Sequence, residues 1–450
     1  MTRNRIIVGL AVLLAAVGVN AFAFHSGGVA ECEGCHSMHE ATSLDGNLLI
    51  AGDASSTCIN PSCHGNTTDT APSSYHVATL DAAYPTKMPV QMTPGGDFGW
   101  LKVDFTWTAS GTNYTEFGYT RGHSIVAVDA GFAADTRRPT GPGGDFDASV
   151  LGCQSCHDPH GKGRQLYNNG AGGYGATNSG EPIYTSGSYG SVPKANTYGG
   201  GGQENQGAPT GLAVGIYRLL WAPASPNPPA GANYTSYPIA VSPSSYNRIE
   251  DVDQTRVAYG GAGSANDWGT WCGACHGEFN VAGGDDQHHP TGEALGTGPL
   301  GASTGSEATN YNAYVSSGRL NGDPARAYNT LVPFAEATSS ISVLASHAQI
   351  NDSYLNGPGT GAEVMCLSCH RAHASGFVED LRWDYGYEFM TKGGQYIGSD
   401  NPLIGTTGRG PLQSRGRTNA WWQQAYYGRA AATHFGPYDR VLCNKCHAQD

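Results

Sequence analysis

Five copies of the pattern Cys-x-x-Cys-His and one wider copy constrain this chain more than any other feature. The 12 cysteines fall into six pairs, and a histidine follows each pair directly, so no cysteine is left over. The six groups are Cys32, Cys35 and His36; Cys58, Cys63 and His64; Cys153, Cys156 and His157; Cys272, Cys275 and His276; Cys366, Cys369 and His370; and Cys443, Cys446 and His447. The second group is wider, because four residues separate its cysteines. This pattern is typical of covalent haem c attachment.

The spacing follows from the chemistry of attachment. Two thiols reach the vinyl groups on one edge of a porphyrin, and the next residue turns its imidazole onto the iron. A zinc site would draw four ligands from two neighbouring pairs, whereas these pairs lie far apart, and a disulfide framework would not need the histidines. We therefore predict six covalently bound haem c groups. A disulfide remains the alternative for Cys58 and Cys63.

The histidines outside the motifs decide between electron transfer and catalysis. The sequence has 16 histidines and the motifs use six, so ten remain, which is enough for a second imidazole on every iron. An iron with two imidazoles has no site for a substrate, so electron transfer is the predicted chemistry. The predicted distal ligands are His39, His76, His123, His160, His289, His347 and His373. The weaker candidates are His25, His288 and His434.

Three of the predicted ligands, His39, His160 and His373, lie three residues after a motif histidine. On a helix this spacing would place the second imidazole beside the first, where it cannot reach the opposite face of the same porphyrin. It could ligate a neighbouring haem and hold the two porphyrins close together. The alternative is a histidine that is exposed or only hydrogen-bonded.

The N-terminus has the features of a secretory signal peptide. Two arginines precede an apolar run over residues 6–17, and a small-x-small sequence ends at Ala23. We expect residues 1–23 to be removed and residues 24–450 to form one haem-carrying body that is exported through the periplasm to the cell surface or beyond. An uncleaved membrane anchor is the alternative.

Composition predicts a mostly irregular fold with short helices, a few short strands and a core built around the haems. The chain has 65 glycines and 25 prolines, and charged residues make up only 14%. Alternation predicts a strand over 100–107 that pairs with 114–119 as a hairpin, and helical spacing occurs near 343–347 and 422–429. Short helices are expected at several motifs, and the Gly-, Tyr-, Asn- and Ser-rich stretch near 166–236 is expected to be a long wrapping loop.

The net charge of −13 bears on partners. Haem propionates would add further negative charge, so we do not expect nucleic acid or anionic membranes as partners. Cationic redox proteins, other redox cytochromes and extracellular metal acceptors fit better.

Long sequence blocks resemble the hexahaem outer-surface cytochromes of the OmcS type, which metal-reducing bacteria polymerise into extracellular conducting filaments. The resemblance covers nearly the whole mature chain. The blocks are FHSGGVAECEGCHSMH from Phe24, QMTPGGDFGW from Gln91, CHDPHGK from Cys156, TRVAYG from Thr255, CLSCHRAHASGF from Cys366 and LCNKCHA from Leu442. Two features depart from the family pattern: the wide second motif, CINPSCH, and a longer, more Gly-rich segment after Arg164.

The resemblance implies a mostly coil protein that is not an enzyme and that holds six bis-histidine haems in a continuous chain. It implies identical subunits stacked head to tail, with His39 crossing to the haem that Cys366, Cys369 and His370 of the next subunit hold. A monomeric electron carrier with the same haems is the first alternative. A multihaem reductase is the lesser alternative, because it would need an iron with an open position.

Overall fold

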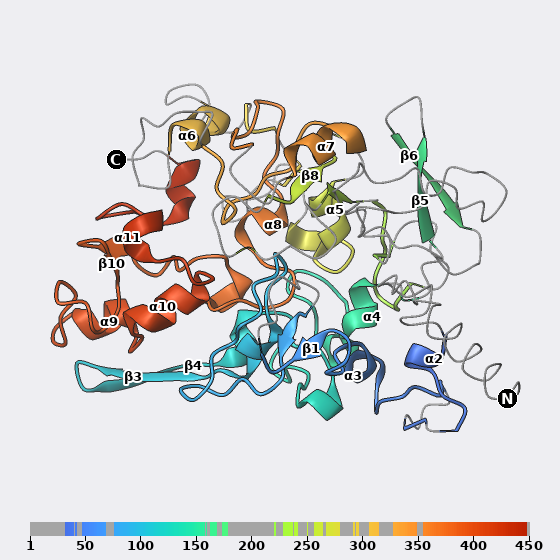
Figure 1. Cartoon of the computed structure of the whole chain (residues 1–450), viewed down its shortest axis with the longest axis horizontal. Helices are drawn as coiled ribbons and strands as arrows, with labels where there is room; N and C mark the ends of the chain where they lie inside the picture. Colours follow the sequence, from blue (N-terminus) through green and yellow to red (C-terminus); the bar gives the residue numbers. More distant parts are fainter. Residues whose placement is uncertain are drawn as a thin grey trace, which may run out of the picture.

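The structure is a computed structural model of the whole chain (Figure 1). The residues that it describes are 32–39, 41–42, 47–68, 76–157, 159, 163–168, 173–178, 220–221, 228–236, 238–241, 250, 256–263, 267–279, 291–292, 294–296, 306–314, 327–348 and 354–447. The predicted signal peptide lies outside these residues, as do His25, His160, His288 and His289.

Regular structure is sparse in the described chain, which confirms the predicted fold class. The helices are α2 (Cys32–Cys35), α3 (Ala54–Cys58), α4 (Cys153–Cys156), α5 (Trp268–Cys272), α6 (Glu307–Ala313), α7 (Ile341–His347), α8 (Cys366–Cys369), α9 (Gly410–Ser414), α10 (Asn419–Ala425) and α11 (Ala431–His434). Single turns of 3₁₀ helix are η1 (Phe98–Lys102), η2 (Gly118–Arg121), η3 (Val128–Ala130), η4 (Ala148–Val150), η5 (Gly277–Phe279), η7 (Val378–Asp380) and η8 (Leu442–Lys445). Each is too short to be stable alone, so tertiary packing holds it in place.

The described strands pair only two at a time. They are β1 (Gly65–Asn66), β2 (Ala78–Thr79), β3 (Phe105–Ala109), β4 (Thr112–Glu116), β5 (Gly163–Asn168), β6 (Gly173–Asn178), β7 (Ile239–Val241), β8 (Ala258–Gly260), β9 (Thr391–Lys392) and β10 (Gln395–Tyr396). β1 and β2 are parallel, whereas β3–β4, β5–β6, β7–β8 and β9–β10 are antiparallel. Two-stranded sheets are marginal by themselves, so they too depend on their surroundings.

The predicted hairpin is present, but its strands begin and end at other residues. The strand predicted from residue 100 starts only at Phe105, because Asp97 caps η1 by accepting a hydrogen bond from Gly99 N. The turn has two residues, Ser110 at φ 50° and Gly111 at φ 80°, as a tight hairpin turn requires. β4 ends before Gly118, whose N–H donates to the Asp104 side chain instead of to the strand.

Both predicted helices are also present. α7 ends at His347, within the expected segment. α10 contains Trp422 but ends at Ala425, because Tyr427 and Gly428 adopt the left-handed conformation with φ of 59° and 77°. Part of the predicted wrapping loop is instead the β5–β6 hairpin, which begins at Gly163. Tyr234, near the end of the predicted wrapping loop, is buried and donates a hydrogen bond to Ser155 O.

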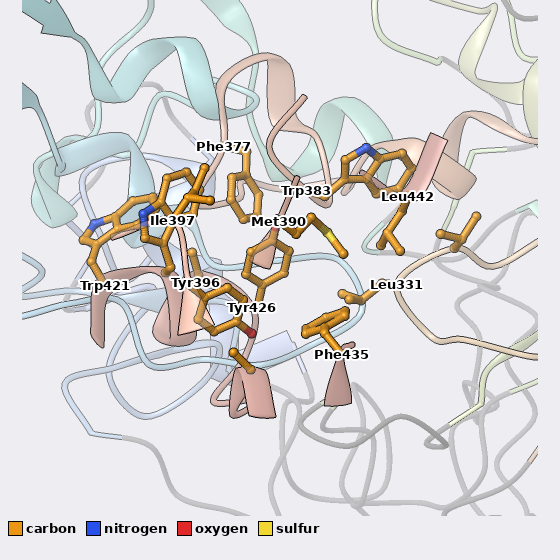
Figure 2. Close-up of a cluster of buried hydrophobic side chains, with 14 of the residues drawn as sticks. Leu331, Phe377, Trp383, Met390, Tyr396, Ile397, Trp421, Tyr426, Phe435 and Leu442 are labelled. Carbon is orange, nitrogen blue, oxygen red and sulfur yellow. The ribbon is translucent and has the colours of Figure 1, made fainter. Parts of the chain in front are cut away.

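Three apolar clusters are separated by the cysteine motifs. The largest is built from aromatic residues of the C-terminal third, with Trp421 packed edge-on against Trp422 and with Tyr396 stacked on Tyr426 at 5.1 Å (Figure 2). A second cluster surrounds Trp268 and Trp271, and a third lies around Phe98 and Phe132. Partly buried cysteines pack against all three, so groups attached to these cysteines would border the clusters.

Buried ion pairs connect segments that are distant in sequence. Glu116 pairs with Arg121 at 3.0 Å and also with Arg417, and these side chains are nearly inaccessible to water. Glu250 pairs with Arg371 at 3.1 Å and with Arg382 at 3.4 Å. Breaking one such buried pair leaves an uncompensated charge, so each fixes the position of the loops that it joins.

No helix of the described chain is long and apolar enough to cross a membrane.

Candidate haem-binding sites

The third and fifth cysteine motifs share one local geometry. In α4 and α8 a single helical turn runs from the first cysteine to the second, and the motif histidine that follows has extended backbone, with φ near −105° and ψ of 133° and 157°. The N–H of the motif histidine donates to the carbonyl oxygen of the first cysteine, at 2.9 Å for His157 and for His370.

The wide second motif keeps this hydrogen bond. α3 ends at Cys58, the next residues form a turn in which Cys63 N donates to Asn60 O, and His64 N still donates to Cys58 O at 3.1 Å. The two extra residues are therefore absorbed before the histidine. Cys58 and Cys63 are both free thiols, so the structure does not form the alternative disulfide.

The assumption that a second histidine shares a helix with its motif histidine is wrong for His39 and His373. α2 ends at Cys35 and α8 ends at Cys369, so neither His39 nor His373 shares a helix with its motif histidine. The motif histidine itself breaks the helix, because its backbone is extended. His39 is exposed, whereas His373 stacks on Phe98 with ring centroids 4.7 Å apart. His160, the third of this group, lies outside the described residues.

Backbone carbonyls fix the tautomer of several motif histidines. The Nδ1–H groups of His36, His276 and His370 donate to carbonyl oxygens, each at 2.7 Å. The acceptors are the carbonyl oxygens of Asn47, Pro142 and Glu379. Because Nδ1 carries the proton, Nε2 keeps its lone pair for a metal, which is the usual arrangement of a ligating histidine.

His123 lies close to the fourth motif. Its Nδ1–H donates to Ala372 O at 2.9 Å, and its ring centroid is 6.0 Å from that of His276. Two imidazoles on opposite sides of one metal, with bonds of about 2 Å each, have centroids roughly 6 Å apart. The His123 side chain is only partly buried, with 38% exposed, and this partial burial together with the nearby His276 lowers its pKa to about 4. The ring is therefore neutral, as a ligand must be.

The pKa values of His373, which is partly buried, and of His76, which is buried, are lowered as well. Burial lowers the pKa of His373 to about 3, and the nearby motif histidine His157 contributes to the shift. Burial likewise lowers the pKa of His76, with a contribution from His64. The Nε2 atom of His76 lies 3.4 Å from the amide of Asn66, which is long for a hydrogen bond.

His347 is held by a carboxylate. Its Nδ1–H donates to Glu336 Oε2 at 2.5 Å, and its ring stacks on Tyr354 with centroids 4.0 Å apart and planes only 10° apart. These partners could not be predicted from the sequence, because Glu336 precedes His347 by 11 residues without any motif. The carbonyl oxygens of Ala372 and Pro142, which orient His123 and His276, could not be predicted from the sequence either.

The cysteine thiols link the motifs into one series in chain order. The thiols of Cys58 and Cys153 lie within hydrogen-bonding contact of each other, and so do those of Cys272 and Cys366. The helices that carry them, α3 with α4 and α5 with α8, pack side by side. Weaker electrostatic interactions, which act without direct contact, relate the thiols of Cys35 and Cys58, of Cys156 and Cys275, and of Cys369 and Cys443. Groups attached to successive motifs are therefore neighbours.

This donor set fits haem c. The 11 cysteines from Cys35 to Cys446 are free thiols, which thioether bonds to vinyl groups require, and histidines with fixed tautomers follow several of them. In the described chain no three His, Cys, Asp or Glu side chains converge as a metal-ion site. A haem needs no such cluster, because the porphyrin itself supplies four nitrogen ligands.

Comparison with known proteins identifies the family. No protein-family model matches the chain. A curated protein, the C-type cytochrome OmcS of Geobacter sulfurreducens, is 43% identical over 466 aligned residues, which cover 98% of this chain and 99% of that protein. The chain belongs to the OmcS family of c-type cytochromes. The predicted family is thus confirmed, and as an OmcS-type cytochrome the chain carries haem c.

Two solved structures share the OmcS fold. An Outer Membrane Cytochrome S filament from Geobacter sulfurreducens is 40% identical, with a TM-score of 0.74 over 95% of this chain and 100% of that chain. A cryo-EM structure of OmcS nanowires from the same organism is 42% identical, with the same TM-score and coverage. The mostly irregular architecture of the chain is therefore that of the OmcS fold.

Proposed function

We propose that this protein transfers electrons along a continuous series of six haem c groups outside the cell, as a subunit of a conductive filament. The observation that carries the proposal is the contact of Cys58 with Cys153 and of Cys272 with Cys366, because it would place the porphyrins of these successive motifs side by side. The relative at 43% identity forms nanowires, which supports the same assembly here. We further propose that residues 1–23 are removed and that residues 24–450 form the single mature body.

The proposed ligation is bis-histidine throughout. Each motif histidine supplies one ligand, and the spacing of 6.0 Å supports His123 as the second ligand of the haem at His276. The proximity of His373 to His157 supports a similar pairing at the third motif. The other proposed distal ligands are His39, His76, His160, His289 and His347.

The bound haem supplies a one-electron couple, and the protein residues determine how it behaves. Two neutral imidazoles on each iron would exclude substrates and keep the reorganisation on electron transfer small. Carbonyl acceptors such as Glu379 O and Ala372 O hold the rings in one orientation, so the ligands do not rearrange between redox states. These features favour electron transfer over catalysis.

The proposed intersubunit ligand is His39. It is exposed and follows Met38, whose side chain is 80% exposed, in the N-terminal part of the described chain. A histidine given to the next subunit's haem at His370 would make a contact between two different surfaces. Such a heterologous contact need not close, so it generates an open filament. The net charge of −13 favours cationic redox proteins or metal ions as the acceptors of the electrons.

The variant His39→Ala tests the assembly, with Met38→Ala as the matched control on the same exposed segment. We expect His39→Ala to retain all its haems but to give monomers or short oligomers, with one haem per subunit converted to high spin. Met38→Ala should form full-length filaments with low-spin haems only. Electron microscopy, size-exclusion chromatography and electron paramagnetic resonance measure these outcomes. Normal filaments of His39→Ala would reject His39 as the bridge, and wild-type protein that never polymerises would favour a monomeric carrier.

A further inference from the structure

Glu336 lies between an imidazole and a guanidinium in the interior. Its Oε2 atom accepts the hydrogen bond from His347 Nδ1 at 2.5 Å, and its Oε1 atom accepts one from Arg256 Nη2 at 2.9 Å. The Glu336 side chain is 11% exposed and that of Arg256 only 2%. The three side chains therefore form a chain of hydrogen bonds that is largely shielded from water.

This arrangement differs from the other imidazoles whose Nδ1 acceptor the structure defines. His36, His123, His276 and His370 donate to neutral backbone carbonyls, at 2.7 to 2.9 Å. His347 donates to a carboxylate, and the bond is shorter. A hydrogen bond to an ionised acceptor is roughly twice as strong as one between neutral groups. It also draws the Nδ1 proton away from the ring and makes Nε2 a stronger electron donor.

Arg256 pairs with Glu336 and holds it in place. Besides the ion pair, its Nη1 atom donates to Asn356 O at 2.7 Å, and its guanidinium lies 4.0 Å from the ring centroid of Tyr328 and 4.8 Å from that of Tyr354. Tyr354 is also the residue on which His347 stacks. A buried carboxylate needs such a paired cation, because burial without one would favour its protonated form. The arginine and the tyrosine together fix the distance between the carboxylate and the imidazole.

We propose that Glu336 is a positioning residue that lowers the reduction potential of the haem ligated by His347. That haem is then a low-potential member of the series of haems. The inference rests on the proposed ligation by His347. A more strongly donating imidazole stabilises the ferric iron relative to the ferrous iron. Reduction adds one electron from a neighbouring haem, no covalent bond forms or breaks, and the Nδ1 proton stays between His347 and Glu336.

The test is a potentiometric titration of the full haem-loaded protein, followed by visible absorption and by electron paramagnetic resonance. Glu336→Gln keeps the size of the side chain and an oxygen acceptor but removes the charge. Glu363→Gln is the matched control, because Glu363 is also buried and, among the described residues, its side chain accepts a hydrogen bond from a neutral donor, the backbone N–H of Gly263 at 2.6 Å. His347→Met marks the haem in question, since a thioether ligand raises its potential while it preserves a six-coordinate iron.

We expect Glu336→Gln to move one of the haem components to a more positive midpoint potential, in the same direction as His347→Met but less far, and to change its resonance signature. Glu363→Gln should titrate like the wild type. The inference is overturned if Glu336→Gln titrates like the wild type, if it moves a component other than the one that His347→Met moves, or if His347→Met leaves every haem unchanged. None of these results depends on filament assembly, which His39→Ala tests separately.

Discussion

Asp439 should make the stability of the protein fall as the pH rises towards neutrality. The carboxyl is inaccessible to water and accepts hydrogen bonds from the Tyr314 hydroxyl at 2.9 Å and from Gly436 N at 3.2 Å. Burial raises its pKa from 3.8 to about 7, although these hydrogen bonds and the nearby Lys445 oppose the shift. The folded protein therefore holds a proton that the unfolded chain releases.

The size of the effect follows from the difference between the two pKa values. Below pH 3.8 both states are protonated, so the favourable contribution of the carboxyl is fully present. Between pH 3.8 and about 7 the unfolded chain alone is ionised, and the free energy of unfolding falls by about 1.4 kcal/mol per pH unit. The total loss is about 4 kcal/mol. For a body of this size it corresponds to about 5 °C in melting temperature.

Asp439→Asn removes the ionisable group, and Asp145→Asn, at an exposed site, is the control. Melting temperatures of the haem-loaded proteins are measured by circular dichroism between pH 4 and pH 8 at one protein concentration. The wild type and Asp145→Asn should lose stability together relative to Asp439→Asn, by about 5 °C at pH 8. If the three profiles run parallel, Asp439 does not carry a proton in the folded protein and the reasoning fails.

Three further predictions concern the haems and the backbone. Intact mass should equal the chain from residue 24 plus six haems, whereas five haems with a Cys58–Cys63 disulfide would exclude the second site. Gly96→Ala should prevent accumulation of folded holoprotein, because the φ of Gly96 is +100° and a Cβ would lie 2.0 Å from the carbonyl oxygen of Ala374. Its control is Gly111→Ala, at φ +80° with open space around it, which should lower the free energy of unfolding in denaturant by only about 1 to 2 kcal/mol. His123→Met should raise the midpoint potential of one haem, and a titration unchanged from wild type would exclude His123 as a ligand.

The sequence predicted the parts of the fold that local chemistry determines. The one-turn helices at Cys153–Cys156 and Cys366–Cys369 follow from the attachment motif, and α7 follows from its apolar spacing. The β3–β4 hairpin was also predictable, because Gly111 permits its turn. Its boundaries were not, since the side chains of Asp97 and Asp104 take backbone donors that alternation alone would assign to strands.

The candidate ligands of the site could be predicted from the sequence, but the residues that surround each ligand could not. A histidine is visible in the sequence, whereas its nearest neighbours are set by the tertiary fold. His123 and His276 are separated by 153 residues, and no pattern in the sequence relates them. The premise of a helix at His373 failed because His370, in extended backbone, ends the helix of its motif.

The contacts between thiols of different motifs have a consequence for biogenesis. In the folded chain Cys58 meets Cys153 and Cys272 meets Cys366, each thiol facing one from another motif. In an oxidising compartment thiols at such distances exchange readily into disulfides. A chain that folded before it received its haems would therefore be cross-linked between motifs and closed to the porphyrins. If the chain is exported as proposed, haem attachment has to precede folding, while the polypeptide is still extended and reduced.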